Sequence, residues 1–76
     1  MIFVDTGAWV ARFYSADRHH MAALQWFHRN KQRLVTTDYI VDEALIVLKA
    51  RGEPRLALKL GELFFGDGLA DLYYLT

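Results

Sequence analysis

The sequence contains no cysteine and only one proline among its 76 residues. The absence of cysteine excludes a disulfide framework and a thiolate metal site. No apolar run is long enough to span a bilayer, because a transmembrane helix needs about 20 predominantly apolar residues. The N-terminal apolar run has no basic segment before it, which argues against a secretory signal. We therefore expect a cytoplasmic protein that makes no membrane contact.

The chain also lacks net charge, because its nine basic and nine acidic residues cancel. Binding to a nucleic-acid backbone rests on Lys and Arg, so RNA contact would need a local cluster such as Arg29, Lys31 and Arg33. Apolar residues, in contrast, are abundant at 54% of the chain. A domain of this size has a thin core. The excess predicts a partner surface, self-assembly or a piece of a larger fold.

The apolar pattern predicts strands that alternate with pairs of helices. Residues 1–4 are continuously apolar, as in a strand covered on both faces. Two more strands are expected at 33–36 and 69–75, with a turn at 66–68. Helices are expected at 7–13, 19–30, 38–51 and 54–65. The order β-α-α-β-α-α-β predicts an α/β domain with parallel strands and right-handed crossovers.

Residues suited to helix ends support these boundaries. Thr6 and Asp17 are candidate N-caps for the first two helices, and Thr37 or Asp38 for the third. Gly52 follows the third helix at the position where glycine commonly ends helices. The only proline, at residue 54, stands at the favoured first-turn position of the fourth helix.

The positions of the carboxylates in two segments of the sequence indicate a functional site. Asp5 directly follows the first strand, and the carboxyl ends of parallel strands border the crevice where α/β sheets bind ligands. A simple capping role explains Asp5 equally well, and both interpretations stay open.

Asp42 and Glu43 lie within an otherwise apolar helix, where a carboxylate is costly unless it is paired or bound to a cation. Adjacent helical residues point about 100° apart, so one of the two faces solvent. Glu43 shares its face with Tyr39 and Val47, whereas Asp42 shares its face with Asp38. This pattern favours Glu43 as the inward carboxylate, and an ordinary surface turn is the alternative.

Asp5 and Glu43 together indicate a hard-metal site built from oxygen ligands. The histidines at 19, 20 and 28 indicate zinc much less well. They contain no i,i+4 pair with a carboxylate between them, as a metalloprotease helix has. A structural role is favoured for all three.

Three stretches of the chain resemble the PIN-domain family, and within it the VapC-like toxin ribonucleases of toxin–antitoxin pairs. They are IFVDTGAWV at 2–10, HHMAA at 19–23 and LVTTDYIVDEAL at 34–45. The first and third stretches together are fairly specific. The order of elements continues to match from 54 to 75, so the resemblance covers essentially the whole chain.

The resemblance implies a PIN-like three-layer α/β/α fold with a parallel sheet. Residues 1–76 would form a single domain that lacks its C-terminal part. The implied activity is that of a Mg²⁺-dependent endoribonuclease, with Mn²⁺ as an alternative ion, that hydrolyses RNA phosphodiester bonds. The implied partners are an RNA substrate, a cognate antitoxin protein and a second copy in a homodimer or larger homo-oligomer.

The resemblance also implies roles for individual residues. Asp5 and Glu43 would be the metal ligands, and Thr6 the hydroxyl residue beside the first acid; all three would belong to the catalytic site. The family takes further acidic residues from a later helix and loop, and Asp67 and Asp71 are not assigned to those roles. A different class of function stays open, in which a catalytically inactive PIN fragment serves only in dimerisation or antitoxin binding. In a third interpretation, the chain is a fragment and the function belongs to its parent.

Overall fold

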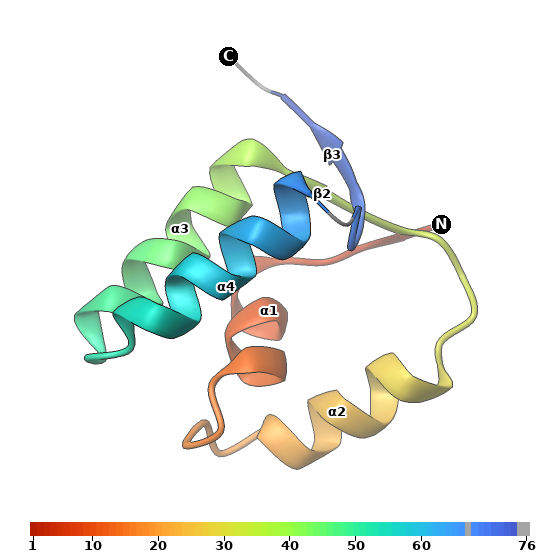
Figure 1. Cartoon of the computed structure of the whole chain (residues 1–76). Helices are drawn as coiled ribbons and strands as arrows, with labels where there is room; N and C mark the ends of the chain where they lie inside the picture. The colour runs from red at the N-terminus through yellow and green to blue at the C-terminus, as the bar shows by residue number, and fades with distance from the viewer. Residues whose placement is uncertain (67, 75–76) are drawn as a thin grey trace.

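A computed structural model of the chain describes residues 1–66 and 68–74. It contains seven elements in the predicted order (Figure 1), with no described helix long and apolar enough to cross a membrane. The elements are β1 (Ile2–Phe3), α1 (Thr6–Phe13), α2 (His20–Arg29), β2 (Leu34–Thr37), α3 (Asp38–Ala50), α4 (Pro54–Phe65) and β3 (Asp71–Tyr73).

The three strands form one parallel sheet in the order β1-β2-β3. Ile2 pairs with Leu34 and Val35 with Asp71. Because successive strands are neighbours, right-handed crossovers bring both helix pairs to the same face of the sheet, as Figure 1 shows. The predicted α/β class with a parallel sheet is confirmed. The described part of the chain contributes two of the three predicted layers.

The other face of the sheet is open within the described residues. Phe3 is 58% exposed and Tyr73 52% exposed, although both belong to strands. Side chains of a strand alternate between the two faces, and the neighbours Ile2 and Leu72 instead pack against the core. The strand β1 also forms one edge of the sheet.

The hydrophobic core lies between the sheet and the helices and is centred on Trp9. The indole is fully buried and contacts the rings of Phe27 on α2 and Phe64 on α4, at centroid distances of 5.4 and 4.7 Å. One side chain therefore joins three helices. The remaining buried members of this cluster are Val4, Val10, Val41, Ala44, Leu48, Ala57 and Leu60.

A short chain of hydrogen bonds crosses this core. The Trp9 indole N–H donates to Thr36 Oγ1 at 3.3 Å, and the Thr36 hydroxyl donates to the Val4 carbonyl at 3.1 Å. Thr36 is fully buried, and a buried polar group without a partner would be costly. The arrangement satisfies each group and fixes α1 to β2 and to the residue that follows β1.

Two predicted helix caps are wrong, those of the first and second helices. Thr6 does not cap α1, because the helix begins one residue earlier than expected and includes Thr6 as its first residue. Asp5 occupies the N-cap position, and its Oδ1 accepts the Ala8 N–H at 3.1 Å. The cap predicted for the third helix is confirmed at the first of its two candidates, because Thr37 Oγ1 accepts the Ile40 N–H at 3.1 Å.

The cap predicted for the second helix is also wrong, because His19 and not Asp17 occupies the N-cap position of α2. Asp17 instead lies two residues earlier, where its Oδ1 accepts the N–H of His19 at 2.8 Å. The other signals predicted for helix ends are found where expected. Gly52 adopts a positive φ of 79° after α3, and Pro54 opens α4. The β3 strand is shorter than predicted, and residue 67 of the predicted turn lies outside the described residues.

Candidate functional site

Asp5 lies where β1 ends and α1 begins, and its carboxylate is exposed. One of its oxygens accepts the Ala8 N–H, so the capping role considered above is real. Among the described residues, no hydrogen bond occupies the other oxygen. Capping and ligand binding are therefore compatible, since the cap fixes the carboxylate while an oxygen stays available.

Glu43 is brought to the same place from α3. The Thr6 hydroxyl donates to Glu43 Oε1 at 2.7 Å, across 37 residues of sequence. Thr6 directly follows Asp5, so this hydrogen bond holds the Glu43 carboxylate against the first turn of α1. The three residues Asp5, Thr6 and Glu43 are together called the carboxylate rim below.

The choice between the two adjacent acids is confirmed as far as exposure is concerned. Asp42 is exposed and Glu43 is half-buried. The reason given by the sequence pattern was incomplete, because Tyr39 on the same face is 62% exposed and provides little cover. Glu43 instead faces α1, whose Thr6 hydroxyl contacts its carboxylate.

The remaining acidic residues do not complete a larger cluster. Within residues 1–66 and 68–74, no three histidine or acidic side chains come together in a way that could hold a metal ion. Asp71 lies at the start of β3 and forms an ion pair with Arg33, the residue before β2. The hydrogen bond and the charge of Asp71 raise the pKa of Arg33. Asp67 lies outside the described residues.

The histidines take separate positions, and two of them have structural contacts. His20 Nδ1 lies 2.7 Å from the Ala11 carbonyl, which ties α2 to α1. His19 Nε2 accepts the Nε–H of Arg18 at 3.2 Å. The structural role that the spacing favoured fits both contacts.

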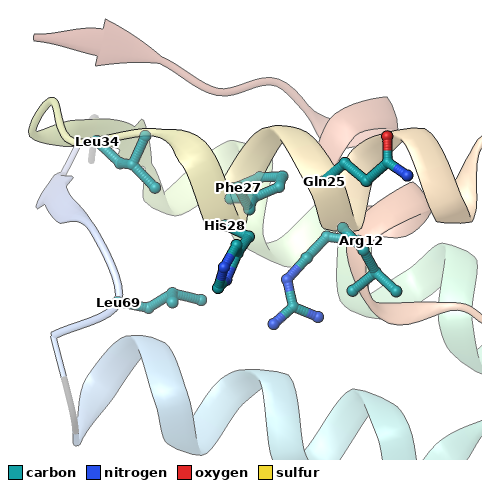
Figure 2. Close-up of a pocket in the computed structure, with 7 residues that line it drawn as sticks. Arg12, Gln25, Phe27, His28, Leu34 and Leu69 are labelled. Atoms are coloured by element: carbon teal, nitrogen blue, oxygen red, sulfur yellow. The ribbon is translucent and has the colours of Figure 1, made fainter.

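Sequence reasoning did not find a hollow at the far end of α1. Figure 2 shows the Arg12 guanidinium and the His28 ring extending to the same side, with Leu69 facing them. Phe27 and Leu34 also line it. Arg12 belongs to the last turn of α1, whereas Asp5 caps its first turn. No sequence signal joins these residues, because they come from four separate segments.

The chemistry of the carboxylate rim fits a hard divalent cation. Mg²⁺ prefers oxygen ligands and is commonly bound by one or two carboxylates, with water and substrate phosphates in its other positions. Asp5 and Glu43 can supply two carboxylates from two elements joined by a hydrogen bond. A soft metal is not favoured, because the chain has no cysteine.

Comparison with known proteins extends this picture. Among solved structures, the chain matches VapC20 of Mycobacterium tuberculosis, which is described as a sarcin–ricin loop cleaving toxin. The TM-score is 0.90 at 22% sequence identity, and the match covers 100% of this chain and 58% of VapC20. At this identity the match establishes the fold. No curated protein matched the chain.

The family comparison covers nearly the whole sequence. The model of the PIN domain matches residues 2–69, a span that includes all three members of the carboxylate rim. The predicted resemblance is therefore confirmed by a match over most of the chain and by the shared fold. The chain belongs to the PIN domain family.

Proposed function

We propose that the chain carries part of the active site of a Mg²⁺-dependent endoribonuclease, the toxin of a toxin–antitoxin pair. Asp5 and Glu43 would bind the cation, and the substrate would be an RNA phosphodiester. The observation that carries this proposal is the 2.7 Å hydrogen bond between Thr6 and Glu43. It brings the second carboxylate to the residue that follows the first.

The contacts of the rim support distinct roles for its residues. Asp5 uses one oxygen for the Ala8 N–H, so its second oxygen is the one available to the cation. Thr6 orients Glu43 and leaves Oε2 available in the same way, which makes Thr6 a positioning residue. Bound Mg²⁺ or Mn²⁺ supplies charge neutralisation at the phosphoryl oxygens and a lowered pKa for an attacking water.

The proposed partners follow from membership in the family and from the fold. VapC20 is described as cleaving the sarcin–ricin loop, and its 22% identity carries only the class of substrate, RNA, into this proposal. We propose a cognate antitoxin as the protein partner and the cytoplasm as the compartment. The chain spans 58% of VapC20, so the activity proposed is that of a protein containing this chain.

The runner-up function is a catalytically inactive module that only binds a partner. The observation that favours it is the apolar surface of the helical face, where Ile46, Leu58 and Phe65 are each at least 58% exposed. The two functions differ in their dependence on the carboxylate rim. A binding module needs neither Asp5 nor Glu43 to hold a cation.

Titration calorimetry with Mg²⁺ and Mn²⁺ tests the proposal directly. We expect weak but saturable binding, because two carboxylates provide less charge than a complete set. Asp5→Asn and Glu43→Gln should each abolish it. Asp42→Asn is the matched control, since it removes an adjacent exposed carboxylate and should leave binding unchanged.

An RNA assay then tests the reaction itself. Cleavage of single-stranded RNA by the chain should stop with EDTA and with either rim substitution. Cation binding that survives both Asp5→Asn and Glu43→Gln would overturn the site. Cleavage that survives them would assign the chemistry elsewhere and favour the binding module for this part of the fold.

A further inference from the structure

The hollow at the far end of α1 brings two basic side chains together. Arg12 comes from α1 and His28 from α2, and Figure 2 shows the guanidinium and the imidazole ring extending to the same side. The hollow has a volume of about 520 Å³, which lies in the usual range for small-molecule sites. Its other lining residues are Leu24, Gln25, Phe27, Leu34 and Leu69.

No carboxylate of the described residues balances these two basic groups. None lines the hollow, and neither Arg12 nor His28 has an ion-pair partner in the part of the chain that the structure describes. Asp71 lines an adjoining hollow but is paired with Arg33. Arg12 is half-buried, and taking a charge out of water is costly unless an opposite charge or hydrogen bonds replace the water. The hollow therefore offers a place to an anionic group.

Stabilisation of the helices alone does not explain this arrangement. Arg12 and His28 each stand in the last turn of a helix, where a cationic side chain interacts favourably with the carbonyl end. That role does not require the two side chains to extend into one hollow. Arg12 is also held over the ring of Phe13, with its guanidinium carbon 4.9 Å from the ring centroid. This cation–π contact restricts the guanidinium without neutralising it.

The opposite side of the hollow is apolar. Leu34 at the start of β2 and Leu69 before β3 line it, and Figure 2 shows Leu69 facing the two basic groups. Both leucines are half-buried, so a ligand can still cover part of their surface. A matching ligand combines an anionic group with an apolar body. Inorganic phosphate would use only the basic side, and an uncharged apolar molecule only the other.

We propose that this hollow binds a nucleoside phosphate, with the phosphate at Arg12 and His28 and the base against Leu34 and Leu69. A guanidinium donates two parallel hydrogen bonds to phosphate oxygens, and every base has a face that packs on side chains. A free nucleotide and a nucleotide within an RNA strand share this chemistry. No residue of the carboxylate rim lines the hollow, so the proposal does not depend on the ribonuclease assignment.

Titration of the purified chain with AMP, followed by NMR, provides the first test. We expect saturable shifts of the Arg12 side-chain N–H signal and of the methyl signals of Leu34 and Leu69. Adenosine and inorganic phosphate each carry one half of the ligand, so each should bind about tenfold more weakly or worse. If phosphate binds as tightly as AMP, the hollow is an anion site without a place for the base, and the proposal is wrong.

Substitution of Arg12 separates ligand binding from helix stability. Arg12→Gln should raise the dissociation constant for AMP about tenfold or more, because a charge-assisted hydrogen bond is lost. Arg12→Lys keeps the charge without the two-pronged geometry and should have an intermediate effect. Arg29→Gln is the matched control, because Arg29 is exposed on α2 and does not line the hollow. A lower urea midpoint for Arg12→Gln with unchanged AMP binding would mean that Arg12 only stabilises its helix, and would overturn the site.

A short single-stranded RNA in EDTA distinguishes the two sources of the ligand. Tighter binding than AMP that is lost with Arg12→Gln assigns the hollow to an RNA strand. Binding no tighter than that of AMP assigns it to a free nucleotide. Asp5→Asn should leave AMP binding unchanged in both cases, so failure of the ribonuclease proposal does not affect this result. Equally tight binding of an oligoglutamate peptide at the same signals would show that charge alone decides, which contradicts a nucleotide site.

Discussion

Two threonine hydroxyls attach α1 to its neighbours, one inside the molecule and one at its rim. Thr36 is fully buried, and its hydroxyl both accepts from Trp9 and donates to Val4. Thr6 is only half-buried and donates to the carboxylate of Glu43. The Thr36 hydroxyl both donates and accepts a hydrogen bond within the fold, whereas the Glu43 carboxylate keeps one oxygen available for a ligand.

This difference separates a structural polar group from a functional one. A hydroxyl among apolar side chains must be satisfied internally, because no water replaces a missing partner. A carboxylate at the rim keeps contact with solvent and can exchange water for a cation. A polar contact should therefore contribute less to the free energy of unfolding the more exposed it is. Substitutions can test this order.

The largest effect should come from removing the side chain on which the inner contact depends. Trp9→Ala deletes a fully buried indole and leaves the hydroxyl of Thr36 without its donor. We expect a loss of about 3–5 kcal/mol in the free energy of unfolding, which is a large share of the stability of a domain of this size. Urea unfolding followed by circular dichroism measures it.

The matched control is Trp26→Ala on α2, because Trp26 is 42% exposed. Its indole contacts Phe27 edge-on at a centroid distance of 5.0 Å and has no place in the central cluster. We expect a much smaller loss of stability. Equal losses for the two tryptophans would mean that α2 is as important to the core as α1.

A smaller effect is expected when only the inner hydroxyl is removed. Thr36→Val keeps the shape of the side chain but leaves the Trp9 N–H without an acceptor in the core. We expect a loss of about 1–3 kcal/mol, the cost of an unsatisfied buried donor. Thr36→Ser retains the hydroxyl and should lose less. Greater damage from serine than from valine would show that packing, rather than hydrogen bonding, is what Thr36 provides.

The fold was predictable because local signals agreed with one another. Continuously apolar segments predict the strands, and amphipathic segments predict the helices between them. Gly52 and Pro54 separate α3 from α4 at the expected place. Both residues act through their own backbone preferences, positive φ for glycine and first-turn geometry for proline. Such signals do not depend on the rest of the chain.

The carboxylate rim was only partly predictable. The position of Asp5 after a strand follows from the sequence. Asp5 caps α1 because the helix begins at Thr6, one residue before the predicted start. Spacing alone could not join Thr6 to Glu43, since they are 37 residues apart and meet only when α1 packs against α3. The resemblance to a family supplied that pair, and the roles in catalysis remain predictions.

At the rim, Thr6→Val should cost less than Thr36→Val, about 1 kcal/mol or below, because solvent can replace the lost donor of Glu43. The dissociation constant for the cation should rise about tenfold or more, because residues that orient a metal ligand typically change metal affinity by this factor. Thr6→Ser is the control that keeps the hydroxyl. If Thr6→Val lowers the stability as much as Thr36→Val does, the contribution of these contacts does not depend on their exposure.

The smallest effect is expected at the ion pair between Arg33 and Asp71, where the arginine side chain is 68% exposed. Exposed ion pairs contribute little, because water and salt screen them. Arg33→Gln should leave the urea midpoint unchanged within error, as should the control Arg29→Gln on α2. Raising the salt concentration should remove any difference between them.

The pH dependence of this pair has a definite sign. Asp71 raises the pKa of Arg33 from a value already far above neutrality. A raised pKa in the folded state stabilises the fold below the unfolded pKa, and that contribution is lost only as the pH rises through the folded pKa in strong alkali. Arg33 therefore stays charged between roughly pH 5 and 9, and its titration adds no slope there. A drop in the midpoint with Arg33→Gln comparable to that of Thr36→Val would break the comparison, because an exposed contact would then equal a buried one.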